Sequence, residues 1–138
     1  MKKLVFYALA LIFFSTDLVS SHAQTVRLAV DIPFNFNINE KPLPAGRYLI
    51  LAQVGILRIT GQNGNAAIVL TNPISGNSPL PGPGAVMFHC YGTRCFLSRV
   101  WSAFTENGQE IAKCRIEKEL ASEKEQLALI TLRGTASR

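Results

Sequence analysis

The chain has 138 residues, of which 48% are hydrophobic, and 14 Lys and Arg outnumber 9 Asp and Glu to give a formal net charge of +5. This length allows one ordinary domain. The basic residues are scattered, which argues against a nucleic-acid partner, while mild basicity favours acidic polymers or membrane surfaces without identifying one.

The first 23 residues have the organisation of a secretory signal peptide. Two lysines precede an eleven-residue apolar run at 4–14, and small residues stand at positions 21 and 23. The run is well short of the roughly 20 residues that span a bilayer. We therefore expect cleavage near Ala23-Gln24, export to the periplasm or out of the cell, a single domain over 24–138, and no transmembrane span after signal removal.

The stretch Val26–Asn39 alternates strictly between apolar residues at even positions and mostly polar residues at odd positions. A period of two over fourteen residues predicts a long strand with one buried face. Pro33 lacks a backbone N–H, so the strand must lie at an edge or bend near Pro33, as in a chain that serves two sheets.

A turn is expected over Glu40–Gly46, which contains two prolines and a glycine. A strand over Arg47–Gln53 follows, and a tight reversal at Val54-Gly55. Residues 56–71 then predict a hairpin with Asn63-Gly64 as its two-residue loop. That register pairs Leu57 with Leu70 and Ile59 with Ile68, which places all four side chains on one buried face.

Residues 72–84 contain four prolines and three glycines, so we expect an irregular loop there. A second hairpin is predicted over 85–103 with a turn at Gly92-Thr93. Its register pairs Cys90 with Cys95 and Phe88 with Leu97, and alternation places Trp101 on their face and Val100 on the other. A turn over 105–109, a short amphipathic helix starting within 111–116 and a final strand over 127–133 complete the chain.

Four motifs together carry a resemblance: Ile32-Pro33-Phe34-Asn35-Phe36, Leu43-Pro44-Ala45-Gly46-Arg47-Tyr48, Leu57-Arg58-Ile59, and the segment from Phe88-His89 through Phe96-Leu97-Ser98 to Val100-Trp101. The chain resembles an uncharacterised family of small exported bacterial β-domain proteins. The resemblance implies a compact β domain with a short helix and no assigned chemistry. The family pattern lacks a cysteine pair at Cys90 and Cys95, so it implies nothing about them.

Cys90 and Cys95 are a candidate disulfide, because the predicted register places them opposite each other and export implies an oxidising compartment. A bridge across so short a loop stabilises by about 2 kcal/mol. The alternative is two buried free thiols. A zinc site using these cysteines, His89 and Cys114 is not expected, because His89 and Cys90 are neighbours on a strand and point to opposite faces.

No catalytic constellation is evident. His89 and Asp31 are the only histidine and aspartate of the processed chain, and no Gly-x-Ser-x-Gly motif accompanies them. The helix glutamates, from Glu117 to Glu125, are interleaved with lysines, which favours a solvated helix face. We expect no catalytic residue, no metal and no cofactor.

The sequence therefore predicts a mainly β domain of about seven antiparallel strands, in a small barrel or sandwich, with one short C-terminal helix. The leading hypothesis for function is a non-enzymatic interaction module whose partner is an unknown protein or envelope component, in an unknown oligomeric state. A carrier with an apolar ligand inside a barrel is the second. Its candidate lining residues are Phe34, Phe36, Tyr48 and Trp101, although plain core packing is the favoured explanation for these aromatic side chains. A thiol-redox or hydrolytic enzyme is third.

Overall fold

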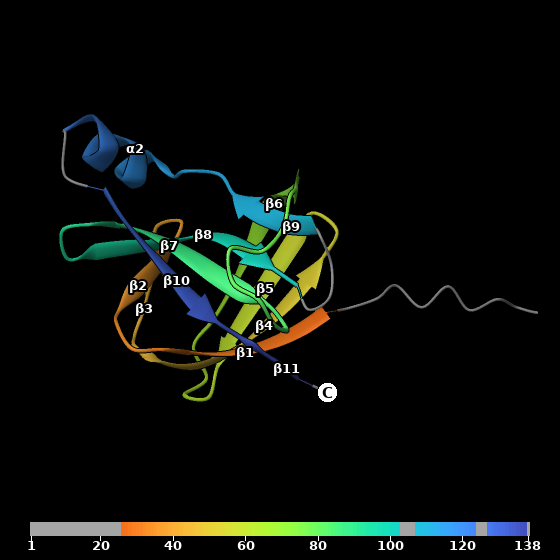
Figure 1. Cartoon of the computed structure of the whole chain (residues 1–138). Helices are drawn as coiled ribbons and strands as arrows, with labels where there is room; N and C mark the ends of the chain where they lie inside the picture. The colour runs from red at the N-terminus through yellow and green to blue at the C-terminus, as the bar shows by residue number, and fades with distance from the viewer. Residues whose placement is uncertain (1–25, 103–106, 124–126, 138) are drawn as a thin grey trace, which may run out of the picture.

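The computed structural model describes residues 26–102, 107–123 and 127–137, and the predicted signal peptide lies outside these ranges. The fold is mainly β with one short helix near the C-terminus, as predicted, although it has eleven strands rather than about seven (Figure 1). In the described part of the chain, no helix has both the length and the apolar character to cross a membrane. The elements are β1 Val26–Ile32, β2 Phe36–Ile38, β3 Lys41–Leu43, β4 Gly46–Gln53, β5 Ile56–Gly61, β6 Ala66–Ser75, β7 Ala85–Tyr91, β8 Arg94–Trp101, β9 Asn107–Ile111, α2 Arg115–Ser122, β10 Leu127–Arg133 and β11 Thr135–Ala136.

The strands form one continuous sheet in the order β10-β7-β8-β9-β6-β5-β4-β1-β11, with β2 and β3 attached to β8. The sheet is not closed by a ladder between its ends, yet one chain segment reaches both, because β10 pairs with β7 and β11 pairs with β1. Gly134 joins these two strands. A Cβ atom there would lie 2.4 Å from Leu28 Cδ1, so the close passage of this segment over β1 requires glycine.

The alternating N-terminal stretch divides at Pro33 into β1 and β2, which belong to the two halves of the sheet. Pro33 lies in neither strand, so no ladder bond is lost at its missing N–H. The even positions from Leu28 to Ile38 are buried, except for the half-buried Phe34, and the odd positions face outward. The predicted bend and the predicted buried face are both confirmed.

Two segments expected to be irregular are strands. Lys41–Leu43 pairs with β2 as a small hairpin, whose turn contains Asn39 with a φ of 53°. Residues 72–75 continue β6, which pairs with β5 in its first half and with β9 in its second. Asn107 to Gln109, predicted as a turn, lies in β9. Proline is tolerated in Lys41–Leu43 and in residues 72–75 because each of these segments is paired along one side only.

The first predicted hairpin register is wrong by one residue. Gly61 faces Asn65 around a three-residue loop, with Gly64 at a φ of 83° and the Asn63 side chain accepting from the Asn65 N–H. This is the loop type in which a glycine in the left-handed region closes the turn. The slip pairs Leu57 with Val69 and turns the next residue along, Leu70, outward.

The second hairpin has the predicted register near its tip, where Cys90 faces Cys95 and Phe88 faces Leu97. A β-bulge follows, because Met87 pairs with Arg99 and leaves Ser98 without a partner position. The bulge reverses the predicted faces of the last two residues. Val100 joins the main core, whereas Trp101 lies on the opposite face.

The core lies between the two halves of the sheet, and Figure 1 shows β7 crossing in front of β4 and β5. Aromatic side chains fill its centre. Phe36 meets Tyr48 and Phe88 edge to face with ring centroids 5.2 and 5.4 Å apart, and Phe34 meets Phe88 at 5.1 Å. Such edge contacts stabilise beyond the area that they bury.

Candidate functional site

The outer side of β1, β4, β5 and β6 is an apolar sheet face that no described element covers. Residues directly opposite each other in a ladder share a face. Ile56 therefore lies beside Leu70 and next to Gln53, while Arg58 lies between Leu51 and Ile68. We call this surface the outer face. Its apolar members are Leu49, Leu51, Ile56, Ile68 and Leu70.

The outer face is unusually exposed for large aliphatic side chains on regular strands. Ile68 is 64% exposed, Leu70 is 76% exposed, and Val54 in the adjoining β4–β5 turn is almost completely exposed. Isolated apolar residues on a surface are ordinary, but a contiguous apolar group on an ordered face marks an interaction site. The one-residue slip of the first hairpin creates this surface, which is why the sequence did not reveal it.

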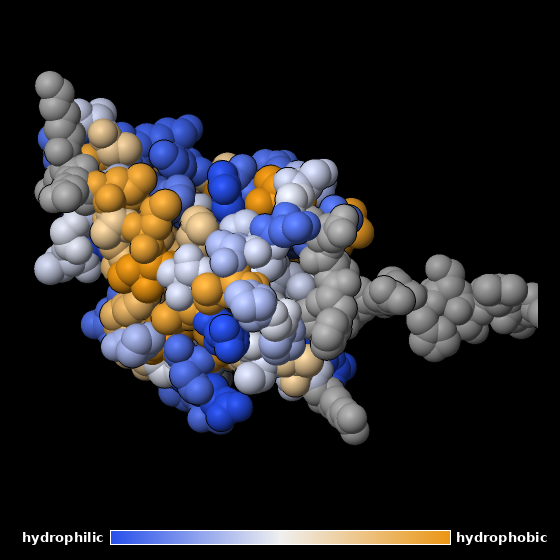
Figure 2. Space-filling view, in the orientation of Figure 1, coloured by the Kyte–Doolittle hydropathy of each residue, from blue (hydrophilic) through white to orange (hydrophobic). Residues whose placement is uncertain are grey.

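A second apolar strip follows β10, at one end of the sheet. Figure 2 shows an orange band over this strand, where Leu127 is 45% and Leu129 is 58% exposed. On its other side β10 pairs with no strand that the structure describes. The strip is narrower than the outer face because Ile130 and Leu132 point into the core.

A buried polar cluster lies between α2 and the outward side of the β7–β8 hairpin. His89 Nδ1 is 3.0 Å from Glu117 Oε1, and Tyr91 donates to the same oxygen at 3.3 Å. Ser98 Oγ is 3.1 Å from His89 Nε2. A carboxylate only accepts, so Nδ1–H donates to Glu117, and Nε2 lies within hydrogen-bond distance of the Ser98 hydroxyl. Glu117 is the buried residue of α2, which contradicts the solvated face predicted for it.

This order of groups, hydroxyl to imidazole to carboxylate, is that of a serine triad. A nucleophile must reach its substrate, and Ser98 is only 4% exposed. Ser98 lies at the bulge of β8, and Glu117 is the buried contact of α2 with the hairpin. The hydrogen bonds of the cluster join the helix to the hairpin, and no spacing in the sequence pairs Glu117 with His89. Asp31, the only aspartate of the predicted processed chain, lies on the exposed side of β1 and is not part of this cluster.

Burial, and then the negative charge of Glu117 and its hydrogen bond, raise the pKa of Tyr91 above its usual value of 10.0. The folded chain thus holds this proton more tightly than the unfolded chain. The resulting stability is complete below about pH 10 and is lost as the pH rises through the raised pKa. We expect the free energy of unfolding to fall above pH 10, and to fall less steeply in Tyr91→Phe, in urea titrations at several alkaline pH values. Parallel slopes would contradict this assignment.

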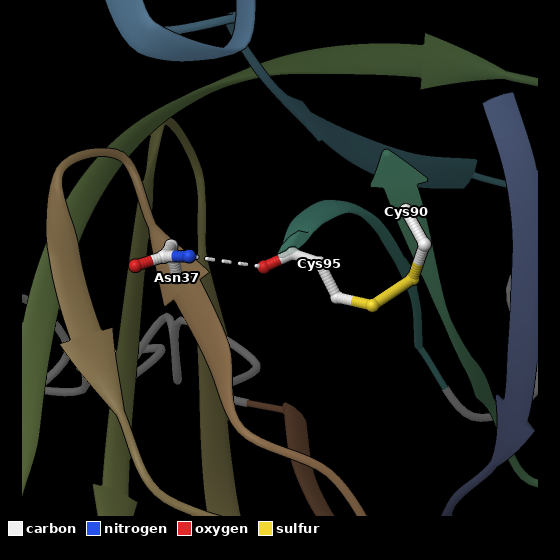
Figure 3. Close-up of a disulfide and its surroundings, with 3 residues drawn as sticks. All are labelled: Asn37, Cys90 and Cys95. Atoms are coloured by element: carbon white, nitrogen blue, oxygen red, sulfur yellow. Dashed lines mark hydrogen bonds between the residues drawn. A yellow bond between two sulfur atoms is a disulfide. The ribbon is translucent and has the colours of Figure 1, made fainter. Parts of the chain in front are cut away.

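Cys90 and Cys95 close the tip of the β7–β8 hairpin on its core side. Their sulfur atoms are 2.08 Å apart, a disulfide distance, and both residues are buried. Figure 3 shows Asn37 of β2 directed at the backbone oxygen of Cys95, to which its amide donates at 3.4 Å. The bridge thus holds the β8 end against which β2 packs. Buried sulfur atoms do not suit thiol exchange, which requires an accessible attack path.

Thiol counting tests the bridge. In exported, unreduced protein, alkylation followed by mass spectrometry is expected to modify one cysteine, Cys114, which is partly exposed. After reduction under denaturing conditions, the same reagent should modify three. Three modified thiols without reduction would exclude the disulfide.

The residues proposed to line a ligand cavity do not come together as a set. Phe34 and Phe36 both contact the ring of Phe88, and Tyr48 contacts Phe36, while Trp101 packs against Gly108 outside the core cluster. The carrier hypothesis thus has three of its four residues in one place. Their rings occupy the space that a ligand would need.

Comparison with known proteins adds no relative. No protein-family model matches the chain, and neither the curated proteins nor the solved structures contain a match.

Proposed function

We propose that this chain is an exported, non-enzymatic binding module that attaches to the cell envelope, or to a secreted component, through its outer face. The observation that carries the proposal is the exposure of Ile68 and Leu70 on paired strands. Contiguous aliphatic side chains on an ordered face lose contact with water when a partner covers them, which favours binding.

Two further observations support a binding role over an enzymatic one. The hydroxyl of the Ser98–His89–Glu117 network is buried, and the sulfur atoms of Cys90 and Cys95 face the core. Neither group offers a reacting atom to a substrate. An oxidising compartment, as the disulfide indicates, fits a chain that begins with the predicted signal peptide, cleaved near Ala23-Gln24.

Retention on isolated envelopes tests the proposal. The processed chain is incubated with envelope fragments from the producing cells and sedimented, and the bound fraction is measured. The double variant Ile68→Thr, Leu70→Thr keeps β-forming side chains but removes the apolar surface. We expect wild type to sediment with the envelopes and this variant to stay in solution.

The matched control is Leu127→Thr, Leu129→Thr, which removes two exposed leucines from β10 and leaves the outer face intact. It should be retained like wild type. Equal loss in both variants would indicate nonspecific adhesion, and no retention of wild type would refute attachment through this face. Circular dichroism of each variant verifies that the fold is unchanged.

A further inference from the structure

The outer face is basic as well as apolar. Arg27, Arg47 and Arg58 all lie on it, against one acidic residue, Asp31, which is opposite Arg47. Among the described residues, none of these three guanidinium groups has an ion pair or a hydrogen bond. Cations without protein partners inside an apolar surface call for a partner that supplies both negative charge and hydrocarbon.

The position of Arg58 argues against a second copy of this chain as that partner. Arg58 lies between Leu51 and Ile68, in the middle of the apolar residues. A two-fold interface brings the same patch of each copy together. Such an interface centred here would bring two Arg58 side chains face to face, and burying two like charges without counter-charges is costly.

The arrangement matches the surface of an anionic bilayer. Aliphatic side chains favour the boundary between headgroups and acyl chains, and arginine extends its charged end to lipid phosphates while its stem lies along apolar groups. Val54 projects beside this face from the β4–β5 turn. A hollow of about 300 Å³ at the Arg47 end, lined also by Ala29, Leu49 and Thr60, provides room for a headgroup.

We propose that the outer face docks on anionic phospholipid bilayers, with Ile68 and Leu70 at the acyl boundary and Arg27, Arg47 and Arg58 at the phosphates. This inference rests on the proposed function, because it names the partner of the same face. The exported chain would meet such lipid at the membrane surface that faces its compartment.

Vesicle co-sedimentation with the processed chain alone tests the proposal. The probes are vesicles of equal parts phosphatidylglycerol and phosphatidylcholine, and vesicles of phosphatidylcholine only. We expect binding to the anionic vesicles, little binding to the neutral ones, and weakening as salt is raised, since salt screens surface charge. Arg58→Gln should lower the partition coefficient about fivefold, and Ile68→Thr, Leu70→Thr should abolish binding.

Arg133→Gln is the matched control, because Arg133 is an exposed arginine on β10, away from the outer face. It should bind anionic vesicles almost like wild type. An equal loss in Arg133→Gln and Arg58→Gln would refute a defined docking face, since net charge alone would then explain binding. Absence of binding to anionic vesicles would refute the lipid partner.

The two proposals fail separately. If vesicles do not bind but envelope retention still depends on Ile68 and Leu70, the lipid proposal is wrong and a protein component of the envelope is the partner. If retention is also absent, both proposals are wrong. If a concentration-dependent dimer forms and Ile68→Thr, Leu70→Thr abolishes it, the face is occupied by a second copy and lipid docking is excluded.

Discussion

Phe36→Ala is expected to lower the free energy of unfolding by about 3–5 kcal/mol, the usual cost of truncating a fully buried aromatic residue. Phe36 is 1% exposed and meets Tyr48 and Phe88 edge to face. Its removal leaves a void between the two halves of the sheet, because strands fixed by ladders on both sides collapse only partly. Urea unfolding followed by circular dichroism measures the change, provided that the m-value is unaltered.

Phe34→Ala is the control for this prediction. Phe34 is half-buried and, among the aromatic rings that the structure describes, meets only Phe88, so its truncation should cost distinctly less. The comparison also tests the carrier hypothesis. If these rings lined a ligand cavity, Phe36→Ala would cost no more than Phe34→Ala, and it would increase the uptake of an apolar dye.

Glu117→Ala is expected to lower the free energy of unfolding by about 2–3 kcal/mol. The carboxylate is the shared acceptor for His89 Nδ1 and the Tyr91 hydroxyl, and removing it leaves one buried donor and one partly buried donor without a partner. Because Glu117 is the buried contact of α2 with the sheet, the helix should also lose protection. Urea unfolding gives the first quantity, and amide hydrogen exchange over Arg115–Ser122 gives the second.

Glu119→Ala is its matched control on the same helix. The Glu119 side chain is 58% exposed and pairs with Arg115 one turn earlier. An exposed pair of this kind contributes about 0.3–0.5 kcal/mol, so the variant should unfold almost like wild type. Equal effects of the two substitutions would contradict a structural role for Glu117. Hydrolysis of an activated ester that Ser98→Ala abolishes would instead reveal a catalytic triad.

Local sequence patterns were sufficient to predict buried faces and strand register where apolar alternation and a short turn act together. The even positions of Val26–Asn39 predict the buried face, and the missing donor of Pro33 predicts the bend. Gly92-Thr93 predicts the register that places Cys90 opposite Cys95. In each case the information lies within a few residues of the element that it specifies, so no distant contact is needed to read it.

The outer face could not be predicted from local sequence patterns. Asn63-Gly64 fits a two-residue loop, yet Tyr48 packs on Gly61 and the chain closes around three residues. A Cβ at Gly61 would lie 2.8 Å from the Tyr48 ring, so this contact requires glycine there. The slip buries Val69 and exposes Ile68, because side chains alternate between faces.

The sequence by itself determined the class of this protein: a mainly β chain with a short helix, whose apolar periodicity specifies which residues of β1 and β2 are buried. Only the tertiary structure decided which side chains are exposed and which distant residues contact each other. The three-residue loop between Gly61 and Asn65 gives the register that forms the outer face, and the bulge at Ser98 sends Val100 inward and Trp101 outward. Glu117 contacts His89, which lies 28 positions earlier in the chain. These outcomes depend on contacts between distant segments, and a difference of one residue in register exchanges the buried and exposed faces of a strand.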